Sequence, residues 1–182
     1  MSSDFSEKKL TSRTVYRGKL LHVKEDEVEL PDGRHAVREY IMHSGAVVII
    51  PFLGRDTLLL EHQFRYPVGR HFYELPAGKV EAGEDTLFTA QRELLEETGY
   101  EAGEWRHLTT LYPCVGYADE RIELYHAREL RHVGHPGENG EFIEALEVEL
   151  DTALEWVRDG RISEAKTIMG VLWAEKIVRE GW

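Results

Sequence analysis

The sequence lacks paired cysteines, long apolar runs and a surplus of positive charge. Cys114 is the only cysteine among 182 residues, which excludes an intrachain disulfide and a zinc site built from several cysteines. The longest apolar run, AVVIIPFL at 46–53, is far too short to span a bilayer. The first ten residues, MSSDFSEKKL, have no apolar signal core. We therefore expect a cytoplasmic protein that does not interact with membranes.

The charge balance is strongly acidic. The chain has 22 basic and 34 acidic residues, which gives a formal net charge of −12. Proteins that hold nucleic acid by its phosphates need positive charge, so a nucleic-acid partner is not expected. A small anionic substrate is compatible with this charge if a metal ion or local arginines offset the general field.

The order of apolar and turn residues indicates an α+β protein. Strand-like segments at 21–30 and 35–42 flank the turn sequence PDG, and GAVVIIPF (45–52) with DTLLLEHQF (56–64) suggests a second hairpin. Further strands are expected at 105–112, 121–127 and 142–150, and the first nine residues are expected to form a loose polar tail. Helical spacing occurs after Glu84 and again in two closing helices, with Asp151 and Ser163 as expected N-caps. A mixed sheet between helices would accommodate this order.

Acidic side chains gather on one face of the helix expected at 84–98. Glu93, Glu96 and Glu97 fall within about 100° of one another on a helical wheel, opposite apolar residues such as Leu94. Carboxylates one turn apart repel by a few tenths of a kcal/mol when exposed, and more strongly when buried. Two interpretations are open: a solvated helix face, or a site for a hard divalent cation such as Mg²⁺.

The spacing around this helix favours the metal site. Gly78, five residues, Glu84, seven residues, Arg92-Glu93-Leu94, one residue, Glu96-Glu97, one residue and Gly99 match the Nudix box at every fixed position. The chain therefore resembles the Nudix hydrolases, which cleave nucleoside diphosphates linked to another group. The resemblance implies a Nudix fold, in which a mixed β-sheet is sandwiched between helices (α/β/α). It also implies an N-terminal antiparallel β extension at 1–43 ahead of a catalytic domain at 44–182.

The same resemblance implies a metal centre. Glu93 and Glu97 would ligate Mg²⁺, with Mn²⁺ as an alternative ion, and Glu96 would support them. A backbone carbonyl near Ala77 would be a further ligand. Arg92 would pair with Glu84 and brace the loop before the helix.

Outside the box, the chain is similar to the ADP-ribose and nucleoside-diphosphate-sugar pyrophosphatases. The segments that carry this likeness include LLLEHQFRYPVG, YELPAG and GRISEAKTIMGVLW. The likeness implies that Arg65 and Arg38 hold the phosphates or the terminal sugar and that Glu74 lines the same cleft. Arginine suits this task because its planar fork can donate to two phosphate oxygens. For Arg38, an ordinary charge on a strand face is the alternative.

Two other substrate contacts are expected where the chain departs from the family pattern. Tyr16 is the candidate for stacking on the base, since Lys19 and Leu20 stand where an aromatic residue is usual. Gly116 is the candidate in the YPCVG segment, which matches the usual SPG only loosely.

The expected function is Mg²⁺-dependent hydrolysis of ADP-ribose or a related nucleoside diphosphate sugar to a nucleoside monophosphate and a sugar phosphate. The alternatives are another Nudix substrate (a dinucleoside polyphosphate, NADH or capped RNA) and a non-catalytic domain that senses nucleotide sugars. The family also implies a homodimer in which the N-terminal extension carries Arg38 into the neighbour's cleft. The general base that activates water is expected on the loop 133–150 at Glu141, with Glu138 as the alternative.

Overall fold

A computed structural model describes residues 4–134 and 142–181. Contacts between residues divide the chain into two compact units. One takes in the chain up to Ser44 together with Tyr112–Arg121, and the other takes in Gly45–Leu111 and Ile122–Trp182. The domain boundary expected after residue 43 stays a prediction.

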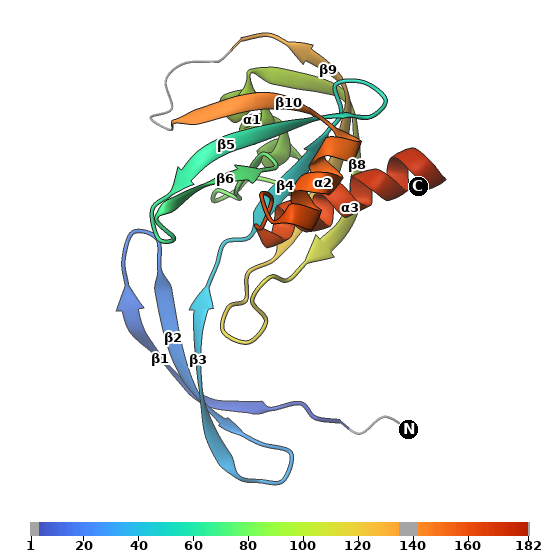
Figure 1. The fold of residues 1–182 in the computed structure, drawn as a ribbon. Helices are drawn as coiled ribbons and strands as arrows, with labels where there is room; N and C mark the ends of the chain where they lie inside the picture. The colour runs from blue at the N-terminus through green and yellow to red at the C-terminus, as the bar shows by residue number, and fades with distance from the viewer. Residues whose placement is uncertain (1–3, 135–141, 182) are drawn as a thin grey trace. The chain divides into compact units, whose positions relative to one another are not determined.

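The smaller unit is built on an antiparallel sheet of three strands in the order β1-β2-β3 (Figure 1). Its strands are β1 (Lys8–Arg17), β2 (His22–Glu29) and β3 (His35–Met42). The hairpin expected around PDG is confirmed, and Gly33 turns the chain with a φ of 82°. The expectation of a loose tail through residue 9 is wrong, because Lys8 and Lys9 already pair with Glu29 and Val28.

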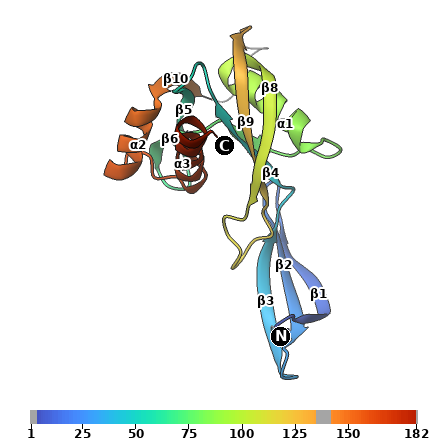
Figure 2. The ribbon, with the colours of Figure 1, turned by 90° about the vertical axis from the view of Figure 1, so that its right-hand side faces the viewer.

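The larger unit contains a mixed sheet of four strands in the order β7-β4-β9-β8. They are β4 (Ala46–Pro51), β7 (Ala77–Lys79), β8 (Tyr100–Leu111) and β9 (Ile122–His132). Only the β4–β9 pair is parallel. Helix α1 (Thr86–Thr98) lies on one side of this sheet, and α2 (Leu150–Asp159) and α3 (Ala165–Glu180) lie on the other (Figure 2). The expected mixed sheet between helices is confirmed.

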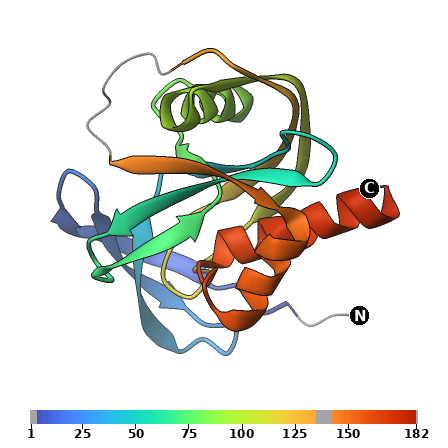
Figure 3. The same ribbon diagram turned by 45° about the horizontal axis from the view of Figure 1, so that its top comes forward.

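A second antiparallel sheet, in the order β10-β5-β6, completes the larger unit (Figure 3). Its strands are β5 (Thr57–Arg65), β6 (Arg70–Glu74) and β10 (Ile143–Glu149). The expected hairpin between 45–52 and 56–64 is therefore wrong. After one bridge between Phe52 and Leu58, β4 and β5 separate into different sheets. A tight turn after β4 is compatible both with a β4–β5 hairpin and with separate sheets. Here β5 pairs with the distant β10, so the two strands belong to separate sheets.

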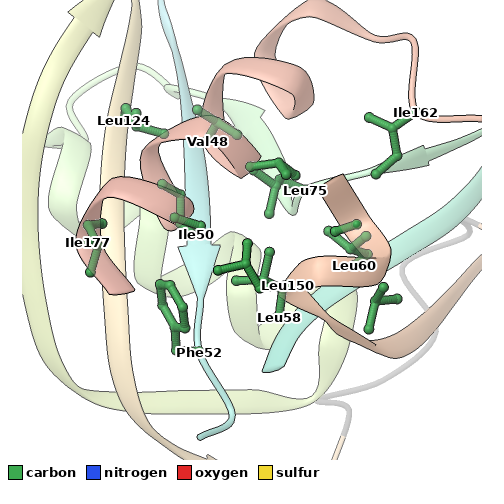
Figure 4. Close-up of a cluster of buried hydrophobic side chains, with 14 of the residues drawn as sticks. Val48, Ile50, Phe52, Leu58, Leu60, Leu75, Leu124, Leu150, Ile162 and Ile177 are labelled. Atoms are coloured by element: carbon green, nitrogen blue, oxygen red, sulfur yellow. The ribbon is translucent and has the colours of Figure 1, made fainter. Parts of the chain in front are cut away.

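The apolar run of β4 is explained by burial on both of its faces. Val48 and Ile50 join the core cluster with Leu75, Leu124 and residues of α3 (Figure 4). Val47 and Ile49 join a second cluster with Ala90 and Leu94 of α1. Because β4 pairs with β7, a strand covered on both sides supports the start of the loop that leads from β7 to α1.

The helix ends differ slightly from expectation. The N-caps of α2 and α3 are Glu149 and Glu164 instead of Asp151 and Ser163. Glu164 accepts hydrogen bonds from the backbone of Lys166 (3.1 Å) and Thr167 (2.9 Å), so a glutamate can replace the shorter cap residues here. Within the described part of the chain, no helix is long and apolar enough to cross a membrane.

One core residue of β9 is polar. His126 is 6% exposed, packs edge-on against Phe52 with ring centroids 5.2 Å apart, and its Nε2 has no hydrogen-bond partner. Burial lowers the pKa of His126 to about 4, and the positive charges of Arg128 and Arg106 add to this effect. The folded protein therefore holds His126 neutral at pH values where the unfolded chain would protonate it.

This histidine makes stability depend on pH. Because its folded pKa lies below the unfolded value of 6.5, the unfolded state binds more protons, and the free energy of unfolding should fall as pH drops from about 6.5 to 4. His126 should contribute about 2–3 kcal/mol to this fall. We expect His126→Leu to flatten the pH dependence measured by denaturant unfolding. His132→Leu, at an exposed position of the same strand, is the control; equal slopes for wild type and His126→Leu would contradict the prediction.

Candidate active site

The sequence that matches the Nudix box folds into β7, a short loop and α1. Asp85 caps the helix by accepting a hydrogen bond from the Phe88 backbone at 2.9 Å, and Gly99 ends it with a φ of 74°. Ala90 and Leu94 are buried against the sheet. Glu97 is also buried, at 6% exposure, whereas Glu93 and Glu96 on the same acidic face are partly exposed.

Arg92 organises the loop before α1. Its Nε and Nη2 donate to the two oxygens of Glu84 at 2.9 and 3.1 Å, which is the ion pair expected from the sequence. Its Nη1 lies 3.0 Å from Glu96 Oε2 and 2.9 Å from Glu93 Oε1. The hydrogen bonds from Arg92 are the largest cause that lowers the pKa of Glu84, to about 2. One guanidinium thus joins three carboxylates, and its bonds to Glu84 tie the loop to α1.

Glu97 faces a second buried carboxylate that the sequence analysis missed. Glu97 Oε2 accepts a hydrogen bond from the Ala77 backbone nitrogen at 3.0 Å. Beside it, Glu61 of β5 is fully buried, and neither of its oxygens has a hydrogen-bond partner. Burial raises the pKa of Glu61 to about 8. Burial, together with the charges of Glu61 and Glu93, raises the pKa of Glu97 well above its usual range.

Two adjacent buried carboxylates cannot both stay charged without a cation. Ionised carboxylates only accept hydrogen bonds, so Glu61 and Glu97 can bond to each other only if one of them keeps a proton. The alternative to that proton is a positive ion. Carboxylate oxygens are the ligands that Mg²⁺ and Mn²⁺ prefer, so the residues present fit a hard divalent cation.

The expected ligands do not form a complete metal cluster in this state. In residues 4–134 and 142–181, no three acidic, histidine or cysteine side chains meet at one point suited to a metal. Glu93 and Glu96 point to Arg92, whereas Glu97 points to Ala77 and Glu61. The contact of Glu93 with Arg92 is through Oε1, and the charge of Glu93 also acts on Glu97.

Gly78 leaves room for the Glu93 side chain. A Cβ atom built on Gly78 would overlap both carboxylate oxygens of Glu93. Gly78 pairs with Val47 in the sheet, so its backbone is fixed by the same strand that supports α1. The glycine of the box therefore serves close approach between backbone and carboxylate.

A second charged cluster lies on β5 and β6. Glu74 is 1% exposed. In the β5–β6 ladder its backbone lies opposite that of Glu61. Arg65 donates to it through Nε at 2.7 Å and Nη2 at 2.8 Å. Lys166 of α3 donates to it at 2.6 Å. Although burial opposes ionisation, the hydrogen bonds from Arg65 and the charge of Lys166 lower the pKa of Glu74.

Of the other expected substrate contacts, three belong to the smaller unit. Arg38 is ion-paired with Glu7, and its Nε lies 2.9 Å from Glu7 Oε2. Tyr16 is 56% exposed and its ring lies over Gly18. Gly116 has open space where a side chain would stand. Their roles in binding stay predictions.

The expected general base cannot be placed. Glu141 and its alternative Glu138 lie outside the described residues. Both stay predictions.

Glu61 and Lys166 are the residues that the sequence analysis missed. Glu61 is a single acidic residue directly after a run of leucines in DTLLLEHQF, and an uncompensated charge on a buried strand is a signal of function. Lys166 lies in the first turn of a helix, where the helix dipole disfavours a cation. Either residue could have been noticed in the sequence. The sequence does not show, however, that Glu61 lies beside Glu97 or that Lys166 pairs with Glu74.

Comparison with known proteins agrees with this geometry. Residues 42–169 match the NUDIX domain family, and residues 7–41 match the nucleoside diphosphate sugar hydrolase N-terminal domain. The chain belongs to the Nudix family. The resemblance inferred from the box is confirmed, and Nudix hydrolases generally use divalent metal ions.

Named relatives match nearly the whole Nudix chain. It is 36% identical over 177 residues to the methanol dehydrogenase activator of Bacillus methanolicus, covering 96% of each chain. It is 36% identical over 171 residues to the ADP-ribose pyrophosphatase of Bacillus subtilis (strain 168), covering 93% of this chain and 92% of that one. A crystal structure of an ADP compounds hydrolase has the same fold, with a TM-score of 0.88, 22% identity and coverage of 99% and 98%.

The packing at Gly78 predicts a specific loss. In Gly78→Ala, the added methyl group should push the Glu93 carboxylate from its place, so turnover should fall at least tenfold, a loss of about 1.4 kcal/mol in transition-state stabilisation. The measurement is the initial rate of hydrolysis of a nucleoside diphosphate sugar at saturating Mg²⁺ and substrate. Thermal unfolding of the variant shows whether the fold is retained. Gly54→Ala is the control, since a Cβ there meets open space. Wild-type turnover in Gly78→Ala would refute the predicted need for close approach.

Proposed function

We propose that this protein hydrolyses the diphosphate bond of ADP-ribose and related nucleoside diphosphate sugars, giving a nucleoside monophosphate and a sugar phosphate, with Mg²⁺ as its cofactor and Mn²⁺ as an alternative. The observation that carries the proposal is the buried pair formed by Glu97 of the Nudix box and Glu61 of β5. This pair requires a cation or a proton. The ADP-ribose pyrophosphatase relative supports the substrate class. Nucleotide sugars and a single unpaired cysteine also suit a cytoplasmic enzyme.

Glu93 and Glu97 would hold the ion, with Glu61 and Glu96 beside them and the Ala77 carbonyl as a further ligand. Mg²⁺ held there would neutralise phosphate charge and lower the pKa of bound water. Arg92 keeps the carboxylates of the box in place through its contacts with Glu84, Glu93 and Glu96. Glu141, with Glu138 as the alternative, would accept the proton of the attacking water.

Arg65 and Glu74 would bind the substrate together. The Arg65 side chain is 41% exposed while Glu74 is buried, so the arginine can present its guanidinium to a phosphate and the glutamate orients it from within. Arg38, Tyr16 and Gly116 are proposed to bind the terminal sugar and the base. These contacts would separate ADP-ribose from other nucleotide sugars.

A panel of nucleoside diphosphates tests the activity. With Mg²⁺, the wild-type protein should convert ADP-ribose to AMP and ribose 5-phosphate, as followed by chromatography. Glu97→Gln should lower turnover by several orders of magnitude, because it removes the charged ligand from the buried pair while leaving the core intact. Glu101→Gln, an exposed change just past the helix, is the matched control and should retain wild-type turnover.

The outcomes separate the alternatives. Preferential cleavage of dinucleoside polyphosphates, NADH or capped RNA would replace nucleotide sugars as the assigned substrate. The absence of any cleavage would favour a non-catalytic domain that senses nucleotide sugars. Glu97→Gln with more than about a tenth of wild-type turnover would refute the metal-site assignment, since that is a change of only about 1.4 kcal/mol.

We also propose that the protein is a homodimer held by the smaller unit. All ten residues of β1 are exposed, including the apolar Leu10 and Val15, and Val37 of β3 is 58% exposed. Small sheets of this kind are marginally stable without a covered face. Burial of this sheet against a second copy would cover these side chains and bring Arg38 to the neighbour's substrate.

Light scattering tests the dimer. At micromolar concentration the mass should be about twice the 21.0 kDa of one chain. Replacing both Leu10 and Val15 with aspartate should shift the protein towards the monomer, and Leu172→Asp, an equally exposed apolar residue on α3, is the control. A mass of one chain for the wild type contradicts the proposal.

A further inference from the structure

Lys166 occupies a position that the helix dipole disfavours. It is the second residue of α3, and cations are favourable at the other end of a helix. Its backbone is fixed by the cap residue Glu164, and the next residue, Thr167, accepts a hydrogen bond from the Leu75 backbone at 3.0 Å. Leu75 follows Glu74 directly. The first turn of α3 is thus bound to the strand end that carries Glu74.

The ammonium group of Lys166 lies inside the charged cluster. Its Nζ is 2.6 Å from Glu74 Oε2 and 3.1 Å from Glu164 Oε2, and its side chain is only 15% exposed. Two cations therefore share the buried carboxylate of Glu74. Arg65 approaches from the more exposed side, and Lys166 from the more buried side.

We propose that Lys166 is a positioning residue for the diphosphate of the substrate. It keeps Glu74 paired from within, so that Arg65 can turn its guanidinium towards a phosphate without leaving a buried carboxylate alone. The inference rests on the proposed function, because it assigns a role within that substrate site. Lys166 acts on substrate binding through Glu74 and Arg65 and does not touch the reacting atoms.

The energetic reason is the high cost of an unpaired buried charge. Breaking a buried ion pair by removing one partner is strongly destabilising, because it leaves an uncompensated charge away from water. Without Lys166, Arg65 is the one cation left on Glu74 among the contacts described, so each hydrogen bond that Arg65 gives to substrate would be taken from Glu74. The guanidinium would then stay on Glu74, and substrate would bind less tightly.

The first test separates binding from chemistry. Lys166→Met keeps the apolar stem and removes the charge; we expect KM for ADP-ribose to rise about tenfold while kcat changes by less than about threefold. Lys166→Arg should restore KM to within about threefold of wild type. Lys176→Met is the matched control on the same helix, where the lysine pairs with Glu180 on the surface, and it should change neither constant.

A second test asks whether Lys166 acts through Glu74. The dissociation constant of α,β-methylene ADP-ribose, an analogue with a non-cleavable bridge, is measured by calorimetry for wild type, Lys166→Met, Glu74→Gln and the double variant. If Lys166 serves only to pair Glu74, Lys166→Met should weaken binding about tenfold in the wild-type background and less than about twofold in Glu74→Gln.

Each result decides the proposal. An unchanged KM in Lys166→Met, a loss confined to kcat, or equal effects of Lys166→Met with and without Glu74 would overturn the inference. So would a loss of thermal stability with weak binding that Lys166→Arg does not restore, which indicates a purely structural lysine. If wild-type protein hydrolyses no nucleoside diphosphate sugar and does not bind the analogue, the proposed function fails and the inference fails with it.

Discussion

The burial of Glu61 beside Glu97 is the constraint on which the larger unit depends. Neither carboxylate is in water, and Glu61 has no hydrogen-bond partner to offset its lost hydration. Such a pair persists only because the surrounding elements over-determine it. Glu61 follows three buried leucines on β5, and Glu97 belongs to the buried stripe of α1. The surrounding strands and helices provide the stability that this pair of carboxylates lacks. A cation that bound between them would relieve their repulsion and stabilise the folded protein.

The acidic residues differ in how the protein neutralises them. Glu84 and Glu74 are held as anions by arginine, with Lys166 as a second cation on Glu74. Glu61 and Glu97 have no basic side chain as a hydrogen-bond partner in the described contacts, and their pKa values are raised. The fold thus separates carboxylates that are ion-paired with basic side chains from buried carboxylates that have no such partner in the described part of the chain. This division explains how a chain of net charge −12 can receive an anionic diphosphate at all.

The sequence predicted the box helix well because its signals are local. The apolar periodicity around Leu94 and the spacing of the box both lie within one stretch of the chain, and the box resemblance implied the Arg92–Glu84 pair. The separation of β4 and β5 was not predicted, because it depends on β10, some eighty residues further along the chain. For the same reason Glu61 and Lys166 were missed: each becomes part of the site only when distant segments pair. Glu141 and Glu138 remain unplaced since they lie outside the described residues.

The pairing of β5 with β10 has a consequence for biosynthesis. Residues 57–63 of β5 take their register from residues 143–149, while the partner of Glu74 on α3 lies at position 166. The carboxylates of the box are therefore synthesised well before β10, which pairs with the strand of Glu61, and before α3, which carries the partner of Glu74. Until then the emerging chain carries the acidic residues of the box without the strands that enclose them in the folded protein. The sheet around Glu61 is therefore complete only after β10 has been synthesised, although the Nudix box precedes β10 in the chain.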